Sequence, residues 1–391
     1  MTSLPDLDQM PPEQLRALAA QLMSKVDTMG RKIHRDETII EQLTHEIAIL
    51  KRHKFAKRSE QISPAQGSLL DDLLNTDLEA IEADLKALHP APAQIEPRQQ
   101  PKRAPLPPQF PRTVIHHEPD NTQCACGCQL QRIGEDVSEK LDYTPGVFTV
   151  EQHVRGKWAC RQCETLTQAP VPPQVIDKGI PTAGLLAQVM VAKFADHLPL
   201  YRQEKIFGRA GLAIPRSTLA QWMGQTGVQL QPLVDALREA VLAQRVVHAD
   251  ETPVQMLAPG EKKTHRAYVW AYSSTPFSAL KAVVYDFSPK ALDYSLKRWV
   301  ALTRYLDDGA VPIDNNQIEN LIRPWALGRS NWLFAGSLRS GKRAAAIMSL
   351  IQSARMNGHD PYAYLKDVLT QLPTQRASEI ERLLPHSWAP A

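Results

Sequence analysis

Two adjacent carboxylates follow an apolar run in the segment VVHADETPV, residues 246–254. The run reaches His248 and then Asp250 and Glu251, and Pro253 stops the strand-like pattern. Such a strand end is either a solvated terminus or a place where Asp250 holds a metal ion over a substrate. Mg²⁺ takes hard oxygen ligands, so Asp and Glu are the residue types that the second interpretation requires.

A partner carboxylate is available in PIDNNQIENLIRP, residues 312–324. Asp314 or Asn315 can cap a helix that carries Glu319 about one turn from its start. Residues 320–359 then contain no acid but six cations: Arg323, Arg329, Arg339, Lys342, Arg343 and Arg355. This one-sided charge indicates a surface facing phosphates. The simpler alternative is an i, i+4 ion pair between Glu319 and Arg323.

The five cysteines form a second chemical group. CACGC supplies Cys124, Cys126 and Cys128, and CRQC supplies Cys160 and Cys163, with alternating, hairpin-like segments between the two clusters. Four thiolates brought together across a hairpin make a closed tetrahedral zinc site, which is structural because no position stays open; the alternative is free buried thiols. The preferred ligands are Cys124, Cys126, Cys160 and Cys163, and Cys128 can replace either of the first two.

Two rival chemistries are weaker. GSLRSGK, residues 336–342, has the spacing of a phosphate-binding loop, but Arg343 stands where a Ser or Thr must bind Mg²⁺. A metal hydrolase built on His248, Asp250 and Glu251 needs a second His, and His265 is the only local candidate.

The elements that must position Asp250 are three predicted strands. Two apolar, alternating runs, RAYVWAYSS (266–274) and ALKAVVYDF (279–287), follow VVHAD at hairpin spacing. An apolar strand that ends in Asp, followed by two antiparallel strands, is how a ribonuclease-H-like sheet begins.

The N-terminal residues 15–50 carry a heptad pattern. One seam holds Ala19, Val26, Ile33, Ile40 and Ile47, and the other holds Leu15, Leu22, Met29, Asp36, Leu43 and Leu50. The pattern favours a self-associating coiled coil over an amphipathic helix packed on its own chain. The basic run KRHKFAKR follows, and its Lys51, Arg52, Lys54, Lys57 and Arg58 are either phosphate contacts or a soluble helix end.

Residues 90–112 contain eight prolines, so they form an extended linker and a domain boundary. Residues 181–245 are predicted to be helical. Within them GRAGLAIPRSTLAQWM (208–223) has the layout of a helix-turn-helix, or of an ordinary helical hairpin. Ser217 or Thr218 would cap the second helix, and the predicted DNA contacts are Arg216, Ser217 and Gln221.

Composition sets broad limits. A chain of 391 residues can hold two or three domains, and the net charge of +3 predicts no partner by itself. No stretch approaches the ~20 apolar residues of a membrane span, and the polar, acidic N-terminus does not look like a secretory signal. We therefore expect a cytoplasmic, nucleoid-associated protein without membrane contact.

Several motifs together resemble the insertion sequence 66 family of bacterial DDE transposases, of the transposase C type. They are HADETP, PIDNNQIENLIRP with the following WALGRSNWLFAGS, and IGEDVSEKLDYTPGVF after the first cysteines. The zipper with its basic run, the cysteine unit, PLYRQEKIF, IPRSTLAQW and the tail DPYAYLKDVLTQLP extend the resemblance over almost the whole chain. The resemblance implies Mg²⁺- or Mn²⁺-dependent DNA cleavage and joining at transposon ends, with Asp250 as the first catalytic acid and Glu319 as the third.

One departure matters. The family has a long segment, with a strand that carries the second catalytic Asp, between the third strand and the Glu helix. Here VVYDFSPK runs directly into ALDYSLKRWVALTRYL, so an internal deletion is predicted near Ser288, Pro289 or Lys290. The remaining candidates, Asp286, Asp293, Asp307 and Asp308, are poor substitutes for the missing Asp.

The predicted fold class is therefore multidomain α+β. It comprises a coiled coil (1–50), a basic run, short helix and Pro-rich linker (51–112), a zinc-binding β unit (113–180), a helical, helix-turn-helix-like DNA-binding region (181–245), a truncated ribonuclease-H-like core (246–358) and a helical tail (359–391). The predicted function is DNA transposition, defective in this copy, with Mg²⁺ (or Mn²⁺) at Asp250 and Glu319 and structural Zn²⁺. The alternative is an inactive DNA-binding remnant that represses or competes with an intact transposase. Predicted partners are transposon-end and target DNA, a second copy through the coiled coil, and accessory transposition proteins.

Overall fold

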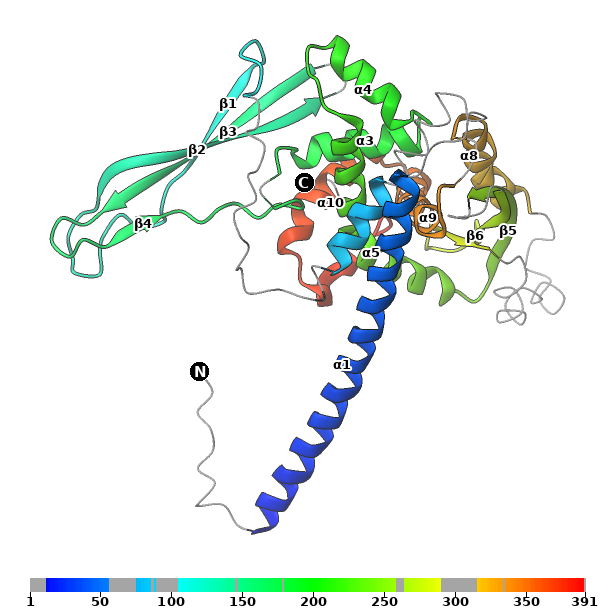
Figure 1. Cartoon of the computed structure of the whole chain (residues 1–391), viewed down its shortest axis with the longest axis horizontal. Helices are drawn as coiled ribbons and strands as arrows, with labels where there is room; N and C mark the ends of the chain where they lie inside the picture. Colours follow the sequence, from blue (N-terminus) through cyan, green and yellow to red (C-terminus); the bar gives the residue numbers. More distant parts are fainter. Residues whose placement is uncertain are drawn as a thin grey trace.

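A computed structural model describes the fold of most of the chain (Figure 1). An N-terminal helix and a long β-ribbon extend from a body in which helices pack against a small sheet. None of the helices in the described ranges is long and apolar enough to cross a membrane. The described residues are 12–55, 75–85, 88, 105–144, 147–177, 179–257, 264–289, 315–332 and 335–389.

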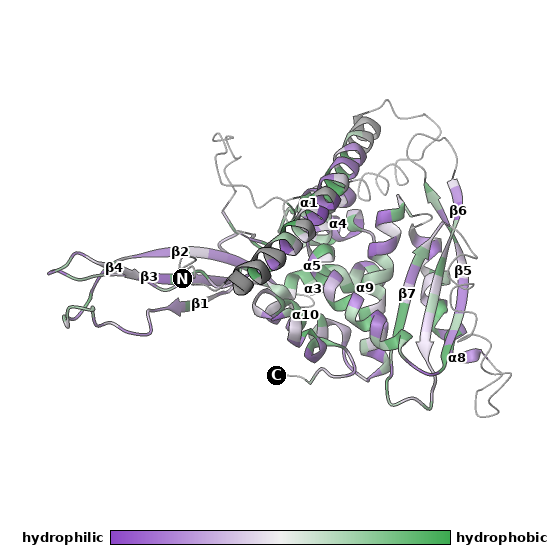
Figure 2. Cartoon of the chain, turned by 90° about the horizontal axis from the view of Figure 1, so that it is seen from below, coloured by the Kyte–Doolittle hydropathy of each residue, from purple (hydrophilic) through white to green (hydrophobic). Residues whose placement is uncertain are grey.

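The β-ribbon is built on two long antiparallel strands, β2 (Gln131–Thr144) and β3 (Val147–Ala159). β1 (Arg112–His117) pairs in parallel with β3, and the short β4 (Leu166–Gln168) pairs with its far end. The hairpin expected between the two cysteine clusters is therefore confirmed. Figure 2 shows that the ribbon is largely hydrophilic, so its strands are held mainly by backbone pairing.

Three helices cover the predicted helical region: α3 (Ala183–Phe194), α4 (Leu200–Arg209) and α5 (Arg216–Leu242). Ser217 and Thr218 do not cap α5, because the helix already begins at Arg216. Pro215 precedes it without a side-chain cap, and the Glu204 carboxylate of α4 accepts a hydrogen bond from the Arg216 backbone N–H at 3.0 Å. The expected local cap was wrong because an acid from the preceding helix supplies it.

The three predicted strands are confirmed as one antiparallel sheet, ordered β5–β6–β7. β5 spans Val247–Leu257, β6 spans Thr264–Ser274 and β7 spans Val283–Ser288. The expectation that Pro253 stops the first strand is wrong. Proline lacks only the N–H, and β5 is an edge strand, where that donor is not needed for pairing.

Two helices pack on this sheet: α8 (Asn316–Trp332) over one face, and α9 (Leu338–Met356) along the outer edge of β7. Ile318, Ile322 and Trp325 of α8 join the buried side chains of the sheet in one cluster. α9 lies along β7, where the Ser353 and Ser349 hydroxyls accept hydrogen bonds from the Val283 and Tyr285 backbone N–H groups at 2.9 and 2.8 Å. Side chains of a helix thus satisfy the open edge of β7.

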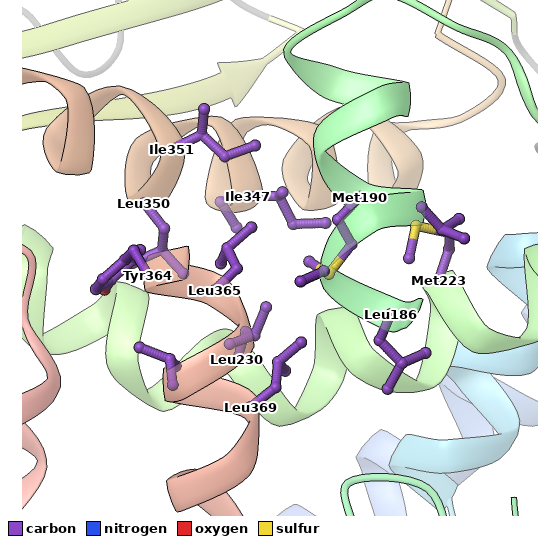
Figure 3. Close-up of a cluster of buried hydrophobic side chains, with 14 of the residues drawn as sticks. Leu186, Met190, Met223, Leu230, Ile347, Leu350, Ile351, Tyr364, Leu365 and Leu369 are labelled. Atoms are coloured by element: carbon purple, nitrogen blue, oxygen red, sulfur yellow. The ribbon is translucent and has the colours of Figure 1, made fainter. Parts of the chain in front are cut away.

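The main core joins parts that are far apart in the sequence. α10 (Pro361–Gln371) packs with α3, α5 and α9, followed by the 3₁₀ turns η3 (Leu372–Thr374) and η4 (Ala377–Leu383). Figure 3 shows Met190, Leu230, Ile351 and Leu365 converging from these four helices. The helical region, the second face of the sheet and the C-terminal segment therefore share one hydrophobic core.

The N-terminal helix α1 (Pro12–Phe55) has two different apolar halves. Val26, Met29 and Ile33 are more than half exposed. Further along, Leu43 packs against Leu78 and Ile81 of the helical segment 75–85. The heptad seam is therefore covered within the chain only near its C-terminal end.

A buried ion pair attaches segment 75–85 to the body. Asp77 accepts hydrogen bonds from Arg343 and from Ser337, the residue that caps α9. The two charged side chains are only 1% and 7% exposed. The segment also crosses α5 closely, because a Cβ on Gly224 would lie 2.6 Å from the Thr76 carbonyl oxygen.

We predict that Asp77→Ala lowers the free energy of unfolding by about 3–5 kcal/mol, because it leaves the Arg343 guanidinium buried and unpaired. Asp84→Ala is the matched control. Asp84 pairs with Arg339 at 2.5 Å, but both side chains are partly exposed, so the loss is about 1 kcal/mol or less. Urea unfolding measures both variants, and equal losses would contradict the role given to the Asp77 pair.

Candidate functional site

Four cysteine side chains meet at the far end of the β-ribbon. The sulfur atoms of Cys124, Cys126, Cys160 and Cys163 all lie within 4.8 Å of one another. The Cys126 sulfur lies 3.6 Å from that of Cys160 and 3.8 Å from that of Cys163. Four sulfurs at ~2.3 Å from a tetrahedral zinc ion are separated by about 3.8 Å, so this donor set fits Zn²⁺.

Local turns bring the thiols together. Gly127 adopts a positive φ of 83° and its N–H donates to the Cys124 carbonyl at 2.9 Å, which turns the first cluster back on itself. The fifth thiol, Cys128, instead lies 2.9 Å from the side-chain oxygen of Gln162. Hydrogen bonds with the Thr165 hydroxyl and the Cys124 thiol lower the pKa of Cys163 to about 6, whereas the pKa of the partner thiol Cys124 is raised to about 12, so the two thiols share one hydrogen bond with the negative charge on Cys163. A thiolate at neutral pH is the form that binds a metal.

Asp250 lies on the sheet face that α8 covers. It pairs with Ala271 of β6, which pairs with Tyr285 of β7, so these three residues share one face. The Tyr285 hydroxyl donates to the Leu321 carbonyl of α8 at 2.5 Å. The Asp250 carboxylate accepts a hydrogen bond from the Glu251 backbone N–H at 2.8 Å, at the outer edge of β5.

The first turn of α8 reaches the same part of β5. The Asn315 side-chain amide donates to the Ala249 carbonyl at 3.4 Å, and the Glu319 N–H donates to the Asn315 carbonyl at 3.1 Å. Asn315, which binds the residue before Asp250, therefore lies one helical turn before Glu319. The Glu319 side chain is exposed. The strand that carries Asp250 and the helix that carries Glu319 therefore lie side by side, as Figure 1 shows.

The other acids do not complete this pair among the described residues. Asp286 lies on the opposite face, aligned with Trp270 and Glu251, and pairs with Arg238 of α5 at 3.4 Å. Burial and the charge of Asp250 raise the pKa of Glu251. Asp293, Asp307, Asp308 and Asp314 lie outside the described residues.

Besides Oε2 of Glu251, two buried polar atoms near Asp250 have no hydrogen-bond partner in the described part of the chain. They are Nε2 of His248, two residues before Asp250 on the same strand face, and Oε1 of Gln317 in the first turn of α8. Such atoms cost free energy unless water or an ion satisfies them. Sequence reasoning named His248 only for a hydrolase and missed Gln317, because burial at a helix–strand junction leaves no local sequence signal.

The predicted DNA-contacting residues fall into different environments. Ser217, Arg323, Arg329 and Lys342 are exposed, and Arg216 and Gln221 are half-buried at the start of α5. Lys51, Arg52 and Lys54 lie in the last turns of α1, and Lys57 and Arg58 lie outside the described residues. Arg339 is bound by Asp84 and Glu46, so acids from the N-terminal region already occupy its guanidinium.

In a comparison with known proteins, profiles of one family match most of the chain. The profile "Transposase IS66 family" matches residues 178–290 and 289–343, and "IS66 C-terminal element" matches residues 349–386. "Zinc-finger binding domain of transposase IS66" matches residues 121–164, and "Transposase C of IS166 homeodomain" matches residues 42–115. The first match is split at residues 289–290.

The relatives found are uncharacterized proteins of Sinorhizobium fredii (strain NBRC 101917 / NGR234). One, y4jD, is 28% identical over 506 residues, covering 94% of this chain and 97% of y4jD. Another, y4qI, is 29% identical over 486 residues, covering 90% of this chain and 89% of y4qI. Both alignments are longer than the 391 residues of this chain, so parts of these relatives face a gap in it. No solved structure matches the chain.

We predict that the purified protein holds one zinc ion per chain and that Cys126→Ser removes most of it. Cys128→Ser is the matched control, because its thiol lies outside the group of four, and it should keep the metal. Metal analysis by plasma mass spectrometry gives the zinc-to-protein ratio. Zinc loss from the Cys128 variant with retention in the Cys126 variant would contradict this ligand set.

Proposed function

The chain belongs to the IS66 family of transposases, and on that basis we propose that it acts on the DNA ends of an insertion sequence. We propose further that it retains two of the three acids of a DDE transposase, so that DNA binding persists while strand transfer is lost. What supports this proposal is the hydrogen bond from Asn315, one turn before Glu319 on α8, to the Ala249 carbonyl, next to Asp250 on β5, together with the position of Asp286 on the opposite sheet face.

Asp250 and Glu319 would hold Mg²⁺ or Mn²⁺, since carboxylate oxygens are the ligands that these ions prefer. When bound, such ions polarise a phosphodiester and activate the attacking oxygen. The chain's own contribution is positioning. Asn315 ties the first turn of α8 to β5, and Tyr285 ties the same helix to β7. The sheet would then be the start of a ribonuclease-H-like core.

An internal deletion would explain the missing acid. β7 ends at Ser288, and the family match is interrupted within two residues of that position. In the described part of the chain no strand lies beside Asp250 on the outer edge of β5. Further along that edge, Arg329 binds the Pro253 carbonyl and an isolated parallel bridge joins Met256 to Ala335. The space beside Asp250 is where an additional strand would have to pair.

The remaining regions would serve DNA binding and assembly. The zinc-holding ribbon and the start of α5 would contact the DNA ends, with Arg216, Ser217 and Gln221 on its first turns. α1 would pair with a second copy as a coiled coil, because Val26, Met29 and Ile33 repeat at heptad spacing and are exposed. A protein that binds ends without joining them competes with an intact transposase and represses transposition.

Strand transfer tests the catalytic part of the proposal. We expect the full chain to bind duplex DNA carrying the element's ends and to form no joined product with Mg²⁺ or Mn²⁺. Asp250→Asn and Glu319→Gln serve as controls and should look the same as wild type. Joined product that disappears in both controls would show that another carboxylate replaces the missing Asp, and the protein would be an active transposase.

Self-association tests the role of α1. We predict that Val26→Glu with Ile33→Glu shifts the protein toward monomer in sedimentation, because the charges enter the exposed apolar seam. Lys32→Glu, also on the exposed surface of α1, is the control for adding an acid to this helix. An unchanged oligomer in the seam variant would rule out the coiled coil.

A further inference from the structure

A surface cleft of about 400 Å³ lies at the outer side of β5, beyond the acid pair. The described residues that line it are Pro253 and Gln255 of β5, Arg266 of β6 and Arg329 of α8. Arg266 was not among the residues that sequence patterns singled out. Arg329, which also lines the cleft, comes from a different element, so the fold alone brings the two residues together.

Neither arginine forms a salt bridge with a described acid. Arg112, Arg132, Arg238, Arg339, Arg343 and Arg382 each form a salt bridge with a described acid. Within the same described ranges, Arg266 and Arg329 form none. The only aromatic contact of Arg266 is with the Tyr268 ring, 5.6 Å from the guanidinium carbon. The cleft therefore holds two exposed positive charges, of which that of Arg266 acts on the Glu251 carboxylate from a distance without a direct ion pair, and this arrangement favours a bound anion.

Arg329 is held in position by the edge of the sheet. Its NH1 group donates to the Pro253 carbonyl at 3.1 Å and to the Thr252 hydroxyl at 3.4 Å. Its NH2 and Nε groups bind no described residue, so they remain as donors. A planar guanidinium anchored through one nitrogen presents the others in a fixed geometry, which suits a phosphate oxygen pair.

The position of the cleft relates it to the acids. Pro253 and Gln255 follow Asp250 by three and five residues along β5, about 10–17 Å at ~3.3 Å per residue, and with Arg266 they lie on the opposite face of the sheet from Asp250. Arg329 follows Glu319 by ten residues along α8, about 15 Å at ~1.5 Å per residue. β5 and α8 thus give a similar separation between the cleft residues and the two predicted catalytic acids. Measured along the duplex axis, this separation corresponds to roughly three to five nucleotides, at ~3.4 Å of axis per phosphate of one strand.

We infer that Arg266 and Arg329 form a binding site for a backbone phosphate of the DNA strand, a few nucleotides from the phosphodiester held at Asp250 and Glu319. This inference rests on the proposed function, because it takes the DNA to lie along β5. The contact sets the position of the strand and carries no sequence information, since every nucleotide offers the same phosphate.

The test compares full-length variants in duplex binding over a range of salt concentrations. Arg266→Gln is the primary variant, because its side chain makes no described hydrogen bond and its loss should leave the fold intact. Arg266→Gln with Arg329→Gln is the second variant. Arg376→Gln is the control, since Arg376 is exposed, forms no described salt bridge and lies in the C-terminal segment. Zinc content and urea unfolding verify that each variant is folded.

The expected result is about tenfold weaker binding by Arg266→Gln, the same for element-end and unrelated duplexes. The slope of log K against log salt should fall by about 0.9 in the double variant, which is the loss of one phosphate contact. Arg376→Gln should leave both values at wild type.

Two results would overturn the inference in different ways. Wild-type binding with an unchanged slope in the double variant, or an equal loss in Arg376→Gln, would exclude the cleft as a phosphate site and leave the proposed function standing. Failure of the wild-type protein to bind any duplex at low salt would overturn the proposed function, and the inference with it.

Discussion

A three-stranded sheet has two edges, and the backbone groups of both must be satisfied. On β7 the Ser349 and Ser353 hydroxyls of α9 take the place of a neighbouring strand. On β5 the outer groups are satisfied one at a time: Asn315 donates to Ala249, Arg329 donates to Pro253, and Ala335 exchanges hydrogen bonds with Gln255 and Leu257. The positions of α8 and α9, and therefore of Glu319, follow from this requirement.

The edge of β5 also bears on the proposed internal deletion. Asp250 accepts the N–H of Glu251, a donor that points to the side where no described strand pairs. A carboxylate that satisfies its neighbour's backbone can replace one hydrogen bond of a lost strand, but it cannot replace a carboxylate which that strand carried. The sheet can therefore remain folded after a deletion while the acid set stays incomplete, as the proposed function requires.

Charge is balanced in space and not along the sequence. Residues 320–359 contain six cations and no acid, which suggested one continuous phosphate-facing surface. The fold divides these cations. Asp77, Asp84 and Glu46 of the N-terminal region neutralise Arg339 and Arg343, while Arg329 stays without an acid and meets Arg266 of β6. The anchored N-terminal segment and the open cleft are two outcomes of the same one-sided composition.

The sequence by itself determined the elements whose signal is local. Alternation placed β2, β3 and the three strands β5–β7, cysteine spacing selected the four thiols that meet, and motif order indicated the family. The predictions for Pro253 and for the start of α5 were wrong. Pro253 fits within β5 because that strand lies at the edge of the sheet, and α5 begins at Arg216 because the Glu204 carboxylate of α4 accepts its N–H. Only the tertiary structure decided which acids share a sheet face, which arginines are neutralised and how each sheet edge is closed. These outcomes depend on contacts between residues tens to hundreds of positions apart, for which short-range patterns carry no information.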